Sequence, residues 1–352
     1  MKRASDLDLI IVGQGLAGSA VAMRALERAY RIAVFDRPAD NRSSRVAAGL
    51  FNPITGKNLV KSWLADAAFP ALHRFYPAIE KITNKRFFHP LPVYKTFNSI
   101  EEQNEWLGKT GDDPYGNYLL RFFPPGKFDQ SINDPFGGFT LSQSGYLDTG
   151  AYLDAVAKFL EERHLYYPEL FDYEKLDVKE DGVAYGSLRA RRIIFCEGVR
   201  NASNPWMNIF PVNSLKGEFI SVQCHWEKDV ILNRGVYMVP GAGSSEWRVG
   251  ATYNWNDHNP GITSWARNEL SGKLDALIRM PYTITGQQWG VRPTTRDRRP
   301  IIGSHPRYPS MIIFNGLGTK GVSLAPYFSE VLFRWMENKG TIEKEADVSR
   351  FN

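Results

Sequence analysis

Short apolar runs and a helical spacing of apolar residues follow one another at the start of this chain. Residues 8–12 are an apolar run of strand type, residues 16–29 are rich in Ala and Leu, and residues 31–35 are a second apolar run. A buried strand, a helix and another buried strand are the expected elements. Together they predict a βαβ unit.

Helical patterns return twice in the first half of the chain. Residues 63–82 have helical periodicity. A further helix is predicted to begin after Asp148, a residue type suited to the N-cap, and four of its apolar residues share one face: Leu153, Val156, Ala157 and Leu160. A hairpin-like stretch separates this helix from the apolar strand predicted at residues 193–196. These segments are typical of an α/β domain.

The C-terminal part repeats the order of strand, glycine-rich turn and helix. Residues 311–314 predict a strand, and the turn that follows holds three glycines, Gly316, Gly318 and Gly321. A helix is predicted over residues 322–336, with Pro326 in its first turn, where the missing N–H is tolerated.

Two intervening regions have another character. Residues 87–139 are rich in Pro, Phe and Tyr and lack a long helical period, so we expect strands and turns there. Residues 216–222, 236–241 and 247–253 are strand-like and are separated by Gly and Pro. They predict a mainly antiparallel sheet.

The expected fold is α/β, with a discontinuous Rossmann-like domain and an α+β substrate domain. The first domain has a central parallel sheet and is expected to comprise residues 1–85, 145–210 and 286–352. The second, with a mainly antiparallel sheet, is expected to comprise residues 86–144 and 211–285. Internal repeats are not evident, and a length of 352 residues suits two domains.

Composition adds limits on class and compartment. The net charge of +5 is a mild excess that suits a polyanionic partner without indicating one. Cys196 and Cys224 form neither a disulfide framework nor a metal cluster, and the six histidines are scattered, so we expect a reducing compartment and no metal. Without a signal-peptide pattern or a run of ~18 apolar residues, the sequence favours a soluble, cytoplasmic protein.

The first predicted turn carries the chemistry. Gly13, Gly15 and Gly18 form G-x-G-x-x-G directly after a strand and at the start of a helix. The first glycine permits the tight turn, the second lets a pyrophosphate approach the backbone, and the third lets the helix pack on the strand. Asp36, at the end of the second strand, can accept hydrogen bonds from ribose hydroxyls. A bound dinucleotide is the resulting hypothesis, and a glycine-rich turn without a ligand is the alternative.

The stretch from Arg37 to Pro53 is rich in small residues, hydroxyls and arginines. Such a stretch can pass close to a ligand and donate to phosphate oxygens, and a solvated loop is the alternative. This loop and the C-terminal glycine-rich turn imply that several distant segments enclose one tightly held cofactor. They therefore disfavour a dehydrogenase that uses NAD.

Several segments together resemble the FAD-dependent amine oxidoreductases that include D-amino-acid oxidase, glycine oxidase and sarcosine oxidase. The matching segments, in the order of the family, are residues 13–18, 43–49, 145–156, 193–198, 211–218, 236–241, 290–303 and 314–326. The resemblance implies FAD as cofactor and an amine or amino acid as substrate. It also implies the reaction: hydride passes from the carbon beside the amine to flavin N5, and the resulting imine hydrolyses. Asp36 stands where many members carry Glu.

Within the family, three segments are most similar to the FAD domain of bifunctional oxidases that remove a carboxymethyl group from modified tRNA uridine: residues 49–53, 290–300 and 316–321. The methyltransferase domain of those enzymes has no counterpart in this sequence. Arg296, Arg298 and Arg299 could hold tRNA phosphates, although Asp297 interrupts the cluster. A tRNA-modifying enzyme is one alternative function, and a non-catalytic FAD- or nucleotide-binding module is another.

The resemblance assigns roles to particular residues. Arg292, in a G-x-R-P segment, is expected to hold the substrate carboxylate through its planar guanidinium, and Tyr237 matches the position whose hydroxyl assists it. An arginine paired with a surface acid and a tyrosine in the core of the sheet are the respective alternatives. The helix after Gly316–Gly321 is expected to point its positive end at the flavin, while Lys320 itself is expected to be solvated. Motif and resemblance together give these cofactor-binding candidates: Gly13, Gly15, Leu16, Ala17, Gly18, Asp36, Arg37, Ser43, Ser44, Arg45, Ala47, Ala48, Gly49, Leu50, Cys196, Glu197, Gly198, Gly290, Arg292, Gly316, Leu317, Gly318, Thr319, Lys320 and Gly321.

Overall fold

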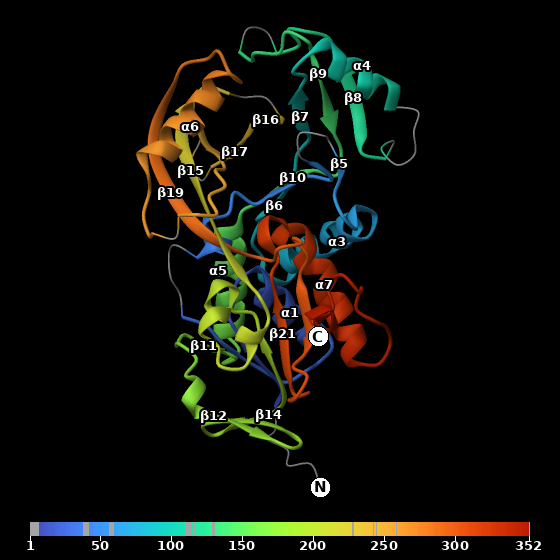
Figure 1. Ribbon diagram of the computed structural model, residues 1–352, viewed down its shortest axis with the longest axis vertical. Coiled ribbons are helices and arrows are strands. Elements are labelled where there is room, and N and C mark those ends of the chain that lie inside the picture. Colours follow the sequence, from blue (N-terminus) through green and yellow to red (C-terminus); the bar gives the residue numbers. More distant parts are fainter. Residues whose placement is uncertain are drawn as a thin grey trace.

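A Rossmann-like sheet forms one half of the molecule, the lower half in Figure 1. The computed structural model describes residues 7–37, 42–55, 60–109, 115, 117–128, 131–226, 229–241, 243, 245–257 and 259–351. The strand order is β11-β2-β1-β14-β13-β12, and β21, which pairs with β20, also pairs with β14. The strands are β1 (Leu7–Val12), β2 (Ile32–Phe35), β11 (Tyr166–Tyr167), β12 (Leu176–Lys179), β13 (Gly182–Tyr185), β14 (Leu188–Phe195), β20 (Ile301–Ser304) and β21 (Met311–Asn315). β11, β2, β1, β14 and β21 run parallel, as predicted.

Helices pack on this sheet or on neighbouring helices. They are α1 (Leu16–Glu27), α2 (Ser43–Val46), α3 (Ala65–Thr83), α5 (Thr149–Glu161) and α7 (Gly321–Met336). Asp148 caps α5 as predicted, since its carboxylate accepts a hydrogen bond from the backbone N–H of Ala151. Short 3-10 turns complete the chain: η1 (Tyr173–Lys175), η2 (Gly198–Ser203), η3 (Met207–Ile209), η4 (Gly318–Lys320) and η5 (Val348–Phe351).

The other half is a largely antiparallel sheet of eight strands, in the upper part of Figure 1. Its order is β19-β15-β18-β17-β16-β7-β9-β8, and among the described strands of this sheet only β16 and β7 pair in parallel. The strands are β7 (Val93–Thr96), β8 (Leu119–Phe123), β9 (Gly138–Leu141), β15 (Asn213–Cys224), β16 (Ile231–Arg234), β17 (Val236–Pro240), β18 (Glu246–Gly250) and β19 (Tyr282–Thr294). The predicted antiparallel sheet is therefore confirmed. Two small sheets lie between the halves: β3 (Leu50–Phe51), β10 (Gly145–Leu147) and β6 (Phe88–Pro90) form one, and β4 (Ile54–Thr55) and β5 (Val60–Lys61) form the other.

Two helices in these regions were not predicted. They are α4 (Ile100–Lys109) and α6 (Ser264–Asp275), so the expectation of strands and turns alone over residues 87–139 is wrong. α4 buries little apolar surface apart from Trp106, so its sequence shows only a weak apolar stripe. α6 is identifiable in retrospect from its N-cap, because the Thr263 hydroxyl accepts from the backbone N–H of Ala266.

The two faces of the large sheet have different neighbours. One face packs on α6 in an apolar cluster that includes Ile220, Val222, Leu270 and Leu274. Side chains alternate along each strand, so the residues between these point to the opposite face. Phe219 and Ser221 are examples on β15. That second face is the one that carries Arg292 and Tyr237, since both pair in register with residues of this alternate set.

Pro326 lies beyond the first turn of α7, contrary to the prediction. Its missing N–H would normally bond to the carbonyl of Val322. The hydroxyl of Tyr76 on α3 instead donates to the Val322 carbonyl over 2.8 Å. A neighbouring helix thus satisfies the acceptor that the proline leaves free.

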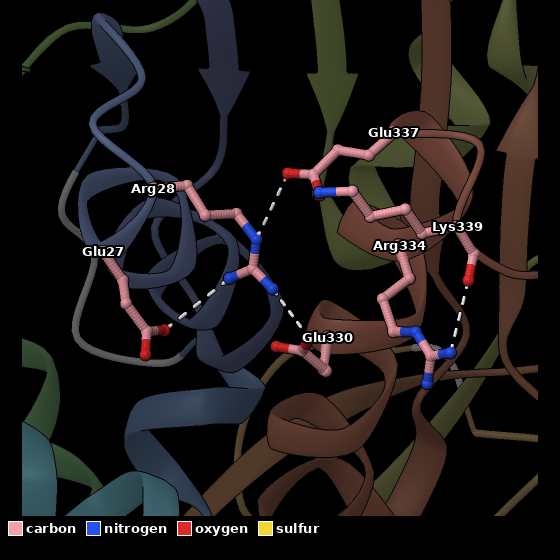
Figure 2. A pocket seen from close by; sticks show the side chains of 6 residues that line it. All are labelled: Glu27, Arg28, Glu330, Arg334, Glu337 and Lys339. Atoms are coloured by element: carbon pink, nitrogen blue, oxygen red, sulfur yellow. Dashed lines mark hydrogen bonds and ion pairs between the residues drawn. The ribbon is translucent and has the colours of Figure 1, made fainter.

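A surface hollow between the C-terminal end of α1 and α7 is shown in Figure 2. Arg28 ion-pairs there with Glu330 (2.7 Å) and Glu337 (3.4 Å), and contacts Glu27 at 3.6 Å. The charged side chains of this hollow are paired with one another, and the hollow lies at the far end of α1 from the glycine motif. We therefore interpret these ion pairs as a contact that joins α1 to α7.

Among the described residues, no helix is both long and apolar enough to span a bilayer.

Candidate active site

The glycine motif forms a tight crossing between β1, α1 and β14. A Cβ on Gly18 would lie 1.7 Å from the carbonyl oxygen of Gly13, and one on Gly13 would lie 2.5 Å from that of Cys196. Gly13 also has a φ of +96°, which favours glycine. The motif therefore holds backbone against backbone at the carboxyl ends of parallel strands. This is where open α/β sheets bind ligands.

The N-terminus of α1 is capped by a neighbouring segment. The backbone N–H of Leu16 donates to the hydroxyl of Ser44 over 3.2 Å, and a Cβ on Gly15 would lie 2.8 Å from the same oxygen. Gly15 itself has no side chain to cap the helix. Ser44 is thus placed beside the glycine motif, as the sequence suggested, although Ser43–Val46 form a short helix rather than an open loop.

Asp36 is buried at the end of β2, as predicted, and its carboxylate has three partners in the protein. One oxygen accepts from the backbone N–H of Gln14 (3.0 Å). The other accepts from the hydroxyl of Tyr166 (3.2 Å) and pairs with Arg42 (2.5 Å). The Arg42 side chain therefore lies where ribose hydroxyls were expected.

Distant segments converge on this point. A Cβ on Gly321 would lie 2.9 Å from Leu16 Cδ1, so the N-termini of α1 and α7 abut. The amide of Asn315 donates to the carbonyl of Gly198 (2.9 Å), which joins the ends of β21 and β14. On the other side, a Cβ on Gly290 would lie 3.4 Å from Val46, which places β19 against α2. These contacts bring together the predicted segments at residues 13–18, 43–49, 196–198, 290–292 and 316–321.

Gly49 has a φ of +74° and passes so close to Leu147 that a Cβ would lie 1.8 Å from its carbonyl oxygen. The adjacent predicted residues are anchored by their backbone. The carbonyl of Ala47 accepts from the hydroxyl of Thr149 (3.0 Å) and from Arg248 (3.4 Å). The small residues of this stretch therefore serve close packing between α5, β10 and β18.

Some predicted residues point elsewhere. Arg45 pairs with Asp154 on α5, and Arg37 and Thr319 are exposed. Glu197 is buried and accepts hydrogen bonds from Tyr173 (2.6 Å) and Asn204 (2.7 Å), and burial raises its pKa. The histidine His258 and the part of the loop at residues 38–41 lie outside the described residues.

Arg292 lies on the second face of the large sheet, directly over a glycine. A Cβ on Gly217 would meet the guanidinium at 2.1–2.4 Å, so the arginine occupies the space that a side chain at 217 would fill. The guanidinium donates to the carbonyl of Thr252 (3.2 Å) and lies 4.9 Å from the ring centroid of Tyr253. Within the described chain no carboxylate ion-pairs with it, so its charge is free to bind an anion.

Tyr237 lies beside Arg292 on the same face. It pairs in register with Gly250, where a Cβ would lie 2.6 Å from the tyrosine hydroxyl. Burial raises the pKa of Tyr237, and the nearby Arg292 charge opposes this only in part. The hydroxyl is therefore protonated at neutral pH and can donate a hydrogen bond.

Lys320 is half-buried, so the expectation of a solvated lysine is wrong. Its ammonium donates to the hydroxyls of Ser62 (3.2 Å) and Thr55 (3.4 Å). Burial first, and then the charge of Lys95, lowers its pKa to about 8. Lys95 was not predicted as a site residue. The sequence feature that could have indicated it is a charged residue, Lys95, within the otherwise uncharged strand Val93–Thr96.

These residues fit FAD. Gly13, Gly15 and Gly18 add no side chains of their own at the N-terminus of α1, and a helix N-terminus favours a pyrophosphate. A second helix N-terminus, that of α7, abuts the first and offers the same positive potential. The carboxylate of Asp36 is of the type that accepts ribose hydroxyls, and Arg42 is its present partner.

Comparison with known proteins extends this assignment. A model of the family described as FAD dependent oxidoreductase matches residues 8–335. The chain is 23% identical to glycine oxidase of Geobacillus kaustophilus, a match that covers 95% of this chain and 94% of that protein. The crystal structure of glycine oxidase from that organism is similar, with a TM-score of 0.79 at 18% identity over 99% of this chain and 98% of the other.

D-amino acid dehydrogenase of Helicobacter pylori is 24% identical over 72% of this chain, and the match covers 64% of that relative's own length. The expected α/β fold with its second, antiparallel sheet is confirmed by the structure and by its likeness to glycine oxidase. Because the family model spans nearly the whole chain, the protein belongs to the family of FAD dependent oxidoreductases.

Proposed function

We propose that the protein oxidises the C–N bond of an amino acid or an N-substituted glycine, with FAD as the electron acceptor. The observation that carries the proposal is the Arg292 guanidinium, which lies over Gly217 beside the protonated hydroxyl of Tyr237 and has no acidic partner in the described chain. Similarity to a glycine oxidase and a D-amino acid dehydrogenase supports the same substrate class. In this proposal residues 1–85, 145–210 and 286–352 bind FAD, and residues 86–144 and 211–285 bind the substrate.

In the proposed complex, Arg292 grips the substrate carboxylate and Tyr237 donates a second hydrogen bond to it. A bidentate pair with arginine fixes both the position and the orientation of the amine-bearing carbon. FAD, when bound, supplies the acceptor for the hydride, and the imine so formed hydrolyses in water. The protein then needs only to hold the carboxylate, exclude water and keep a positive potential at the N-termini of α1 and α7.

The test is anaerobic reduction of the bound FAD, measured as the loss of its visible absorbance. The panel is glycine, sarcosine, proline, D-amino acids, L-amino acids and a tRNA that carries carboxymethylaminomethyl-uridine. We expect bleaching by at least one small amine, and we expect Arg292→Met to raise its KM by roughly 10- to 100-fold, as the loss of a charge-assisted contact implies. Arg267→Met, at an exposed position of α6, is the matched control.

A protein that binds no FAD would contradict the assignment of the cofactor. A holoprotein that no amine reduces would instead contradict the proposed reaction and favour a non-catalytic module. If Arg292→Met reacts as fast as the parent at every substrate concentration, the role proposed for Arg292 is wrong.

The tRNA alternative gains no support from the relatives named above. Of the basic residues on which it rested, Arg299 lies over the ring of Trp63, with 4.3 Å between the guanidinium carbon and the ring centroid. Asp297 pairs with Arg350. These groups are engaged within the protein, so we do not propose a tRNA substrate.

A further inference from the structure

The second face of the large sheet carries one more cation, Lys95 on β7. Tyr94 points to the apolar cluster under α6, and Val93 belongs to the opposite cluster, so alternation places Lys95 on the face that carries Tyr237. The strand order β17-β16-β7 separates Lys95 from Tyr237 by one strand. Asn233, between them, pairs directly with Tyr237. At ~4.8 Å per strand, the two backbone positions are about 10 Å apart.

Lys95 is buried without a partner. Its exposed fraction is 7%, and throughout the described part of the chain no carboxylate pairs with its ammonium. Burial lowers the pKa of Lys95 to about 8, although the charge of Glu102 on α4 raises it. A buried ammonium normally has a counter-ion or a set of hydrogen bonds. Lys95 has neither among the residues that the structure describes.

Lys320 supplies a second positive charge to the same place. It is the N-cap residue of α7, where the helix dipole is positive and where Asp, Asn, Ser or Thr are preferred. After burial, the charge of Lys95 is the second cause of the lowered pKa of Lys320, so the two ammonium groups lie within Coulomb range of each other.

We propose that Lys95 and Lys320 form a subsite for a second carboxylate of the substrate, which would then be an amine with two acidic groups. The inference rests on the proposed function, and it adds the class of substrate. One carboxylate binds Arg292 and Tyr237, and the other binds the two lysines across the width of one strand. Two cations that no carboxylate of the described chain ion-pairs with repel each other, and an anion between them removes that repulsion.

The decisive experiment measures binding without turnover. Malonate, succinate and glutarate, and the monoacids propionate, butyrate and valerate, are titrated into the FAD-loaded protein by calorimetry. The variants are Lys95→Met and Lys320→Met, with Lys158→Met on α5 as control, because the Lys158 side chain is 70% exposed. We expect one diacid to bind at least roughly tenfold more tightly than the monoacid of equal length, as a charge-assisted contact implies. Either lysine variant should abolish this preference, and the control should keep it.

The proposal is overturned if the wild-type protein shows no diacid preference, or if the preference survives in both lysine variants. A shift of the flavin reduction potential in those variants with an unchanged diacid preference would also overturn it, since the lysines would then serve the cofactor. If diacids bind through the lysines but no amine bleaches the flavin, the subsite stands and the proposed oxidation fails. If sarcosine or D-alanine is oxidised as well as iminodiacetate or D-aspartate, the oxidation stands and the subsite fails.

Discussion

Lys95→Met should stabilise the protein at neutral pH. Burial lowers the pKa of Lys95 from 10.5 to about 8, and at about 1.4 kcal/mol per pKa unit this equals a cost of about 3 kcal/mol for keeping the ammonium charged in the folded state. Methionine has a similar length and no charge, so it fills the same space without that cost. We expect the free energy of unfolding to rise by about 2–3 kcal/mol at pH 7.

The pH dependence gives this prediction a distinctive sign. The folded-state pKa is lower than that of the unfolded chain, so between about 8 and 10.5 the unfolded state binds more protons. The stability of the parent protein therefore rises with pH through that window, as Lys95 loses its proton in the folded state. The cost is complete below about pH 8, and the advantage of Lys95→Met should vanish near pH 10.5.

The assay is urea-induced unfolding of parent and variant at fixed FAD concentration, because a ligand that binds only the folded state adds its own stability. Curves are compared at about pH 7 and about pH 10, because the difference in unfolding free energy between variant and parent should be larger at the lower pH. Lys158→Met serves again as control. A variant less stable than its parent at pH 7, or a gap that is the same at both pH values, would show that Lys95 is not an uncompensated buried charge.

Three further predictions follow from single contacts. Gly217→Ala should displace the Arg292 guanidinium, which a new Cβ would meet at 2.1 Å. Steady-state kinetics should then show a substrate KM raised by roughly tenfold, with FAD still bound. Gly272→Ala is the control, because a Cβ there would have no neighbour within 4 Å. Tyr76→Phe should leave the carbonyl of Val322 unpaired and cost about 1–3 kcal/mol of unfolding free energy in urea. The KM for an oxidised diacid should rise as pH increases through about 8, the pKa of both Lys95 and Lys320, while the KM for a monoacid should not; parallel profiles would contradict the subsite.

Local patterns could predict elements whose cause is local. The glycine motif, the N-cap Asp148 and the apolar strands of both sheets each depend on neighbours a few residues away, and all are confirmed. The helices α4 and α6 were missed because both are polar overall and contribute few apolar residues to a pattern. Pro326 was placed in the wrong turn because its acceptor is satisfied by Tyr76 on another helix, which no local pattern records.

In the candidate site, too, some residues could be predicted from the sequence and others only from contacts between distant segments. Resemblance could single out Arg292 and Tyr237, but it could not indicate that Gly217 makes room for the guanidinium, because the pairing of β15 with β19 joins residues far apart in the chain. Lys95 was missed for a related reason: an isolated lysine in a strand is usually solvated, and only the sheet order places it on the face of Tyr237. The fold therefore brings together the positive charges of Lys95 and Lys320, which no carboxylate of the described residues ion-pairs with. A protein retains an arrangement that costs about 3 kcal/mol where an anionic ligand offsets the cost, which makes the stability gain of Lys95→Met and its loss of diacid binding two consequences of one charge.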